Sequence, residues 1–342
     1  MADIIPKFKM DQIKVLATSA CNLNCTHCFR SQDKNEYSLS KKQLIEIVDF
    51  AIDNSIKKLS FSGGEFFVHE NAYEILDYCL KNDLNISILT NAIDIDISFF
   101  KKNKNLKKLS FQVSIDGMSE IHNQRRGNMS FERTMKNVKA LYDLNIPITA
   151  SMVLDIYNYK EIIKVLELPY FANFNFLPVA STNEGNSYMD YIPKKEKEEY
   201  ENTINILYKK ENVFLGKEHR CHMFPLGLGI KYDGNVYPCA VARDYNLFCM
   251  GNLNEQSLYE IVNNYFESEE GKKIKQYKSN DINKCNECKM NNVCNRGCRV
   301  RAYKYFGNLM EPDPFCCRLY KNEFSEESIN CLFWGTRNEK CI

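Results

Sequence analysis

The sequence lacks the features that would place the protein in a membrane or on a nucleic acid. In its 342 residues no apolar run approaches the roughly 18 residues of a membrane span, and the amino end has no signal-peptide core. An excess of charge is also missing, because 45 Lys and Arg stand against 44 Asp and Glu. Proteins that bind phosphate backbones usually carry a basic excess. We therefore expect a cytoplasmic protein with no membrane and no nucleic-acid partner.

Low-complexity tracts are absent too, as are internal repeats beyond an alternation of strands and helices. Hydrophobic residues make up 44% and charged residues 26%, which is typical of a chain that buries a core and excludes disorder. The length exceeds one ordinary domain of about 100–200 residues. It predicts one large domain or two unequal ones.

Cysteine is the residue present in excess. The count of 15 is odd, so the cysteines cannot all pair within one chain, and nothing directs the chain to an oxidising compartment. We therefore expect metal ligands rather than disulfide bridges. An early group comprises Cys21, Cys25 and Cys28, a late group lies in the last third of the chain, and only Cys79 stands between them.

The first two thirds of the chain alternate short apolar runs with longer amphipathic ones. The expected strands are Lys14–Thr18, Lys58–Phe61, Ile86–Thr90, Leu109–Ser114, Pro147–Val153 and Asn173–Leu177. The expected helices are Lys41–Asn54, Ala72–Lys81, Ile97–Lys102, Phe131–Leu144, Lys160–Glu167 and Lys194–Lys210. This α/β alternation predicts a parallel sheet with right-handed crossovers, as a partial barrel or an open sheet. In both architectures the active site is expected at the carboxyl ends of the strands.

Capping signals support two of the helices. Ser40 followed by Gln43 has the form of a capping box, and Ser130 is expected to cap the helix that follows it.

After about Val213 the pattern changes. Residues 229–237 are typical of a hairpin with Asp233-Gly234 at its turn, and a helix is expected over Leu258–Phe266. The cysteine-rich remainder shows little hydrophobic periodicity, so we expect it to need metal to hold its shape. With a boundary near 212–218, the predicted domains are 1–215 and 216–342.

The first motif with chemical meaning is Cys21-Asn-Leu-Asn-Cys25-Thr-His-Cys28, directly after the first strand. Three thiolates at this spacing can hold three irons of a 4Fe–4S cube and leave the fourth open to a small molecule. A three-ligand zinc site and buried inert thiols are the alternatives.

The second motif is Ser62-Gly63-Gly64-Glu65, directly after the second strand. Paired glycines let a ligand approach the backbone, and the carboxylate beyond them can accept hydrogen bonds from an ammonium group. A tight strand-to-helix turn explains the same residues, but the position on the rim of the early cysteines favours a binding role.

The third motif is a late cysteine array. Its core is Cys285-x2-Cys288-x5-Cys294-x3-Cys298, preceded by Cys221 and by Gly234-x4-Cys239 and followed by Cys316-Cys317. The four-cysteine core alone favours zinc. Seven cysteines are too many for one tetrahedral ion and suit two multinuclear sites better.

Together these motifs resemble those of the radical S-adenosylmethionine (SAM) enzymes that carry a SPASM extension. The early loop resembles their Cys-x3-Cys-x2-Cys motif, and the late array is similar to the SPASM pattern, with twelve residues between Cys221 and Gly234. The resemblance covers roughly residues 12–320. It implies a partial (β/α)6 barrel that binds SAM, followed by a small cysteine-rich SPASM domain, with three 4Fe–4S clusters in all.

The resemblance also implies roles for single residues. Cys21, Cys25 and Cys28 would ligate the catalytic cluster, and its open iron would take the amino and carboxylate groups of SAM. The residues implied in SAM binding are Gly63, Gly64 and Glu65 for the ammonium, Ser114, Arg126 for the carboxylate, His27 near the adenine, and Asn91 and Leu177 at strand ends. Barrel core is the alternative for Leu177.

In related SPASM enzymes the auxiliary ligands interleave. Cys221, Cys239 and Cys298 would hold the nearer cluster. The implied ligands of the farther cluster are Cys285, Cys288, Cys294 and either Cys316 or Cys317. Cys249 lies farther beyond Cys239 than the SPASM pattern places an eighth ligand. The nearer cluster therefore either keeps an open iron or is capped by Cys249. No role is assigned to Cys79, Cys331, Cys341 and the unused member of the Cys316-Cys317 pair. Buried thiols are expected there, with a hydrogen-atom donor as the alternative.

The resemblance implies reductive cleavage of SAM to a 5′-deoxyadenosyl radical that removes hydrogen from a peptide or protein, with a flavodoxin- or ferredoxin-type reductant. Crosslinking, epimerisation and oxidation stay open. Formylglycine formation is disfavoured, because Ala240 stands where sulfatase-maturing members have Asp. The chain starts close to its first strand, so no added leader-binding domain is expected. A radical enzyme acting on a small metabolite and a non-catalytic zinc-stabilised interaction module are the alternatives.

Overall fold

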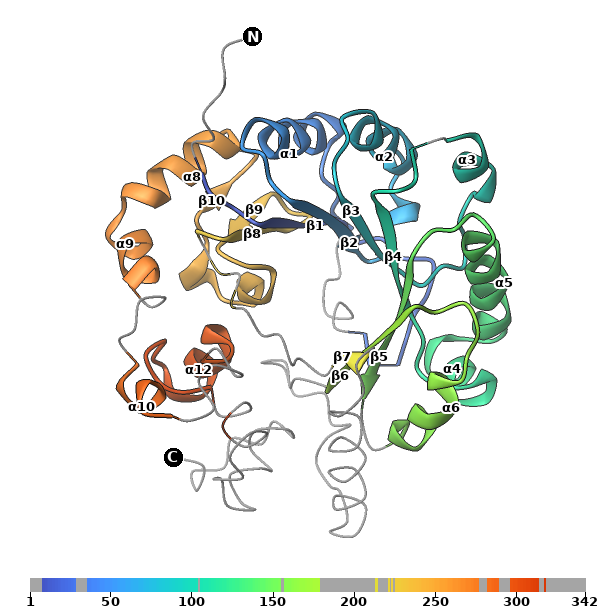
Figure 1. Ribbon diagram of the computed structural model, residues 1–342. Helices are drawn as coiled ribbons and strands as arrows, with labels where there is room; N and C mark the ends of the chain where they lie inside the picture. Colours follow the sequence, from blue (N-terminus) through green and yellow to red (C-terminus); the bar gives the residue numbers. More distant parts are fainter. Residues whose placement is uncertain are drawn as a thin grey trace. The chain divides into compact units, whose positions relative to one another are not determined.

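The structure is a computed structural model, and Figure 1 shows its chain. The residues that it describes are 8–28, 36–103, 105–154, 157–178, 213–214, 221, 223, 225–276, 282–288, 296–313 and 317. The expected helix Lys194–Lys210 lies outside them, as do Cys294, Cys316, Cys331 and Cys341. None of the helices in the described ranges is both long and apolar enough to cross a bilayer.

Strands and helices alternate in chain order. The strands are β1 (Gln12–Thr18), β2 (Lys58–Gly63), β3 (Ile86–Thr90), β4 (Leu109–Ser114), β5 (Ile148–Leu154), β6 (Asn173–Pro178), β7 (Val213–Phe214), β8 (Gly227–Ile230), β9 (Asn235–Tyr237) and β10 (Gly251–Asn252). The α-helices are α1 (Lys41–Asp53), α2 (Ala72–Lys81), α3 (Ile97–Lys102), α4 (Ser119–Arg126), α5 (Ser130–Tyr142), α6 (Ile162–Leu166), α8 (Leu258–Glu267), α9 (Glu269–Gln276), α10 (Asn283–Asn286) and α12 (Arg299–Phe306). The short 3₁₀ helices are η1 (Phe66–Val68), η2 (Tyr159–Glu161), η4 (Ala240–Asp244) and η5 (Asn246–Phe248).

The chain forms two compact units, each built from several segments. The first contains Met1–Ser114, Arg126–Thr149 and His222–Lys275, and the second contains Ile115–Arg125, Ala150–Cys221 and Gln276–Ile342. The proposed boundary near 212–218 falls mostly outside the described residues, so the division at 215 stays a prediction.

The sheet of the first unit has the strand order β10-β9-β8-β1-β2-β3-β4. Strands β1 to β4 are parallel neighbours, as the sequence predicts. The predicted hairpin is present as β8 and β9, which pair antiparallel, and β8 extends the parallel sheet by pairing with β1. That last pairing is not foreseen from the sequence. In the second unit β6 pairs parallel with β7.

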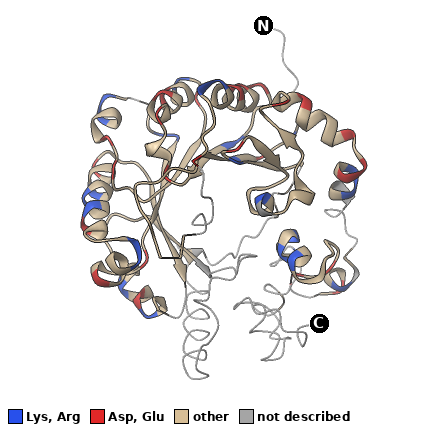
Figure 2. Cartoon of the chain, turned by 180° about the vertical axis from the view of Figure 1, so that it is seen from behind, with Lys and Arg blue, Asp and Glu red and all other residues tan. Residues whose placement is uncertain are grey.

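One face of the first unit's sheet is covered by helices. Ile13, Val15 and Phe61 on this face are fully buried, and α1 and α2 lie along it (Figure 1). Because side chains alternate along a strand, the residues between them point to the opposite face. Lys, Arg, Asp and Glu are interspersed along the outer helices in Figure 2, as expected of solvated helix surfaces.

The capping predictions have different outcomes. Ser40 and Gln43 form both bonds of a capping box at the start of α1, which confirms the prediction. Ser130 is the first residue of α5 rather than its cap, because Met129 precedes the helix in a left-handed conformation with φ of 57°. The expected helix Lys160–Glu167 consists of the 3₁₀ turn η2 followed by α6. Helix α4 is not predicted, since Ile121 is its only aliphatic residue.

Candidate functional site

The candidate site lies at the carboxyl ends of the first four parallel strands. The early cysteines follow β1, the two glycines end and follow β2, Asn91 follows β3, and Ser114 ends β4. Parallel strands that are neighbours bring these ends to one edge of the sheet. The topology therefore gathers most of the residues predicted for the catalytic cluster and SAM.

The two glycines are fitted tightly against the start of the cysteine loop. The Gly64 N–H donates to Thr18 O at 2.7 Å, and the Glu65 N–H donates to Ala20 O at 2.9 Å. A Cβ at Gly63 would collide with Thr18 O, and one at Gly64 would collide with Ala20 O. Gly63 also has a φ of 142°, which L side chains rarely adopt. The pair therefore fixes the distance between the cysteine loop and Glu65.

Gly64→Ala is expected to lower the free energy of unfolding by about 2 kcal/mol or more, because backbone must move to admit the new methyl group. Gly307→Ala is the matched control. At Gly307 φ is 65° and a Cβ meets nothing within 4 Å, so only conformational strain of about 1–2 kcal/mol applies. Urea unfolding of the two variants measures the difference. A smaller loss for Gly64→Ala than for Gly307→Ala would contradict the tight fit.

Glu65 is a buried carboxyl group in a polar cradle, with 3% of the residue exposed. Thr90 Oγ1 donates to its Oε1 at 2.8 Å, and the Asn91 N–H donates to its Oε2 at 2.8 Å. Burial raises the pKa of Glu65 above its usual range, although these hydrogen bonds and the charge of Arg126 oppose the rise. A ligand ammonium would favour the ionised form, because an opposite charge compensates the lost hydration.

Glu65→Gln is expected to change the pH dependence of stability. Because the folded pKa of Glu65 is raised, its contribution to stability is present below the unfolded pKa and is lost as the pH rises through the folded pKa. The stability of the wild-type chain relative to Glu65→Gln should therefore fall as the pH rises above about 4.3. Urea unfolding without SAM at pH 5 to 8 measures this trend, and SAM should reverse it in the wild type. A difference that does not change with pH would contradict the raised pKa.

Arg126, the last residue of α4, reaches the cysteine loop. Its Nη2 lies 3.5 Å from His27 Nε2, and its Nη1 lies 4.0 Å from Cys25 Sγ. Arginine only donates, so His27 Nε2 is the acceptor in this contact. The structure thus brings together a guanidinium, an imidazole and the Cys25 thiol, which the sequence predicts for one site.

Asn91 has a structural role that sequence reasoning does not supply. Its Nδ2 donates to Asn22 Oδ1 at 2.7 Å, and its Oδ1 accepts from the Ile93 N–H at 2.9 Å. Asn22 in turn donates to Asp94 Oδ2 at 2.8 Å. Asn22, inside the first cysteine motif, therefore ties the cysteine loop to the end of β3. The signal in the sequence for this role is an amide side chain directly after Cys21.

Two predicted SAM contacts are placed only through their strands. Ser114 is partly buried at the end of β4. Leu177 lies in β6 of the second unit, and its side chain is outside the described part of the chain. Both assignments stay predictions.

A buried polar network in the second unit surrounds the loop between β4 and α4. Asp116, His122 and Asn158 are fully buried. The Asp116 N–H donates to His122 Nδ1 at 3.3 Å, and Asn158 Nδ2 donates to Asp116 O at 3.2 Å. Arg125 Nε lies 3.8 Å from Asp116 Oδ2. The network holds the helix whose last residue is Arg126.

The early cysteine loop suits a multinuclear iron–sulfur group. All three cysteines are partly exposed, and the loop offers three thiols within eight residues. A cluster spreads its ligands over several metal atoms, and three closely spaced thiols can each bind one of them.

The late cysteines occupy both units. Cys239 follows the hairpin in the first unit, directly before η4. In the second unit burial raises the pKa of Cys298, and the nearby charge of Cys221 acts in the same direction. Cys285 lies in α10, and the Cys288 N–H donates to Cys285 O at 3.2 Å. The division of these thiols between two clusters stays a prediction.

The cysteines without an assigned ligand role differ from one another. Cys79 is fully buried in α2, as expected of an inert thiol, and burial strongly raises its pKa. Cys249 lies between β9 and β10, with its Sγ 3.6 Å from both Asn235 Oδ1 and Gly251 O. These contacts place the Cys249 thiol against the hairpin, and its role as an eighth ligand stays open.

Comparison with known families agrees with the two sets of motifs. A profile of the radical SAM superfamily matches residues 15–168, and a profile of an iron–sulfur cluster-binding domain, SPASM, matches residues 221–289. The first range contains the early cysteines and the glycine motif. The second contains Cys221, Cys239 and Cys285.

Several curated proteins are similar to the chain. The subtilosin biosynthesis protein AlbA of Bacillus subtilis is 27% identical over 72% of this chain and 58% of its own length. The AdoMet-dependent heme synthase of Methanosarcina barkeri is 27% identical over 87% of this chain and 94% of its own. The killing factor maturation protein SkfB of Bacillus subtilis is 26% identical over 71% and 62%. The chain thus spans less than two thirds of AlbA and SkfB.

Solved structures show the same fold. SuiB of Streptococcus suis, bound to SAM, superimposes with a TM-score of 0.70 at 16% identity over 90% of this chain and 77% of SuiB. A structure of anSMEcpe with bound AdoMet superimposes with a TM-score of 0.66 at 21% identity over 91% of both chains. The mostly parallel sheet is therefore that of the radical SAM partial barrel, joined to a carboxyl-terminal SPASM region, and the chain is a radical SAM enzyme of the SPASM group, related to peptide maturases.

Proposed function

We propose that this enzyme modifies a peptide or protein substrate by crosslinking, epimerisation or oxidation. The observation that carries the proposal is its similarity to AlbA and SkfB, whose names assign them to bacteriocin biosynthesis and killing factor maturation. The fold it shares with SuiB supports it, because one SuiB structure holds the precursor peptide SuiA. Formylglycine formation is disfavoured by Ala240 after Cys239.

The proposed roles follow from the geometry of the described residues. SAM and the cluster supply a 5′-deoxyadenosyl radical when both are bound and an external flavodoxin- or ferredoxin-type protein delivers an electron. Glu65 holds the SAM ammonium, since it is a buried carboxyl group whose charge lacks hydration. Arg126 holds the SAM carboxylate beside Cys25. Gly63 and Gly64 keep Glu65 at a fixed position relative to the cysteine loop.

A small metabolite is the second candidate substrate. The match to the heme synthase of Methanosarcina barkeri covers 87% of this chain and 94% of the heme synthase. The match to AlbA covers only 58% of AlbA. Iron analysis does not distinguish the two substrate classes. It does distinguish a radical SAM enzyme from a zinc-stabilised module, because three 4Fe–4S clusters predict about twelve irons per chain.

The test is an anaerobic reaction of reconstituted protein with SAM, dithionite and a short peptide encoded beside its gene. Mass spectrometry should show a crosslinked peptide lighter by two hydrogen atoms or an oxidised peptide. Epimerisation leaves the mass unchanged, so chiral amino-acid analysis of the hydrolysed peptide detects that modification. A tetrapyrrole incubated in parallel is the metabolite arm. An unmodified peptide together with a changed tetrapyrrole would replace the first proposal by the second.

A further inference from the structure

The face of the first unit's sheet that α1 and α2 do not cover carries two lysines on neighbouring strands. Lys14 on β1 lies between the buried residues Ile13 and Val15, so it points to the opposite face. Lys58 on β2 is in register with Gln12, two residues before Lys14, and therefore shares that face. Both lysine side chains are exposed.

Register places Lys14 beside the Cys239 backbone. Lys14 is paired with Gly229 of β8, so substituents of the two residues point to the same side of the sheet. A Cβ at Gly229 would meet the backbone of Cys239 and Ala240 at 2.7 and 2.5 Å. The segment that begins at Cys239 therefore lies directly over Gly229, on the face that Lys14 occupies.

A third cation comes from the same segment. Arg243 lies in η4, and its Nη1 donates to Ala240 O at 3.0 Å. Burial lowers the pKa of Lys14 most, the positive charges of Lys58 and Arg243 lower it further, and Cys239 alone raises it. Among the described residues the structure records no ion pair of Lys14 or Lys58 with a carboxylate. Cys239 is thus the group whose negative charge, when ionised, would favour the charged form of Lys14.

We propose that Lys14, supported by Lys58 and Arg243, raises the reduction potential of an iron–sulfur cluster bound through Cys239. The inference rests on the proposed role of Cys239 as an auxiliary ligand. Reduction adds one electron, and hence one negative charge, to the cluster, with dithionite as the electron donor. Fixed positive charges nearby stabilise that added charge, because opposite charges attract one another.

The arrangement explains why two lysines share one face of the sheet with no carboxylate ion pair recorded in the described part of the chain. Two like charges on one face lower the stability of the folded chain unless an anion lies between or beside them. A thiolate-bound cluster supplies this anion, and it favours the charged form of Lys14, as Cys239 already does.

A redox titration of the reconstituted protein, followed by electron paramagnetic resonance, tests the proposal. The signal of the Cys239 cluster is the one that changes in Cys239→Ser. In Lys14→Met the ratio of reduced to oxidised cluster at a fixed potential should fall about tenfold, which corresponds to about 59 mV for one electron. Lys14→Arg keeps the charge and should restore the ratio, and Lys58→Met should shift it less, in the same direction.

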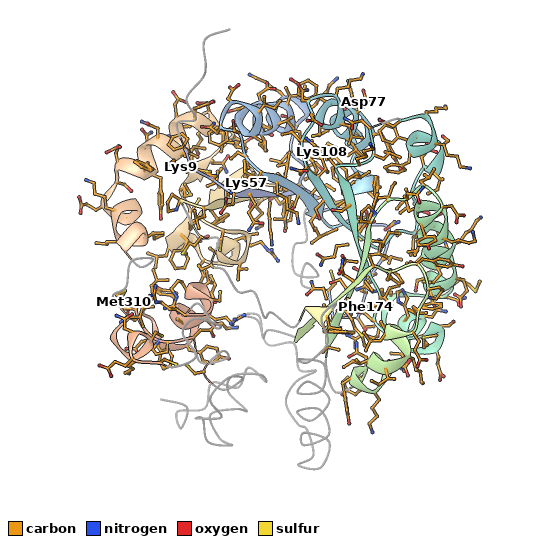
Figure 3. The ribbon with its side chains drawn as sticks, viewed as in Figure 1. Lys9, Lys57, Asp77, Lys108, Phe174 and Met310 are labelled. Carbon is orange, nitrogen blue, oxygen red and sulfur yellow. The ribbon has the colours of Figure 1, made fainter. Side chains whose placement is uncertain are left out.

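Lys57→Met is the matched control. Lys57, labelled in Figure 3, adjoins Lys58 but pairs with Asp11 at 2.9 Å and has 78% of its side chain exposed. Its removal takes away the same charge and should leave the ratio unchanged. An unchanged ratio in Lys14→Met, with Cys239→Ser altering one signal, would overturn this inference and leave the proposed ligand in place. If Cys239→Ser alters no cluster signal, the ligand assignment fails and the inference fails with it.

Discussion

Replacing Cys28 with alanine is expected to abolish the formation of 5′-deoxyadenosine from SAM. Cys28 is one of three thiols on the loop after β1, beside Gly63, Gly64 and the guanidinium of Arg126. Two thiolates hold a cube poorly, and no other described side chain of the loop offers a thiol. Chromatography of the products after anaerobic reduction with dithionite measures the loss, which should exceed a hundredfold.

Cys79→Ala is the control for the loss of a thiol as such. Cys79 is fully buried in α2, away from the strand ends that carry the site. Its replacement removes a buried sulfur at a cost of about 1 kcal/mol and should leave 5′-deoxyadenosine formation close to that of the wild type. Activity retained in Cys28→Ala would contradict the assignment of the early loop as the catalytic cluster site.

Arg126→Met is expected to weaken SAM binding by about 10- to 100-fold. A hydrogen bond between a guanidinium and a carboxylate contributes about 1.5–3 kcal/mol, and methionine keeps the length of the side chain without its charge. Initial rates of 5′-deoxyadenosine formation at varied SAM concentration measure the change. We expect KM to rise more than kcat falls, because the interaction is present in the bound ground state.

Arg133→Met provides the matched control for Arg126. Arg133 pairs with Asp94 at the surface, where both side chains are about half exposed. Exposed ion pairs contribute about 0–1 kcal/mol, so this variant should bind SAM as the wild type does. Equal KM values for wild type and Arg126→Met would show that the Arg126 guanidinium, although next to His27 and Cys25, does not bind SAM.

Sequence patterns predict the first unit well where burial repeats regularly. Strands β3 and β4 and helices α2 and α3 have the predicted bounds, because each combines a clear apolar pattern with a polar boundary. Helix α4 escapes prediction since its buried side chains are His122 and Arg125, which periodicity does not count as core. Its position is set by tertiary hydrogen bonds around Asp116 rather than by hydrophobic burial.

Motif spacing predicts which residues share the site, but not how they contact one another. The tie between Asn91 and Asn22 needs the loop after β1 to fold back on the end of β3, which local sequence does not specify. The same holds for Lys14. Its proximity to Cys239 follows from the parallel pairing of β8 with β1, a contact between residues more than two hundred positions apart.

The most direct test of the account is electron paramagnetic resonance of the dithionite-reduced protein with and without SAM. SAM is expected to change the signal of one cluster. This signal should be missing in Cys28→Ala, and Glu65→Gln should need more SAM for the same change. A spectrum that SAM leaves unaltered, in protein that carries its full iron, would contradict a SAM-binding cluster on the loop after β1.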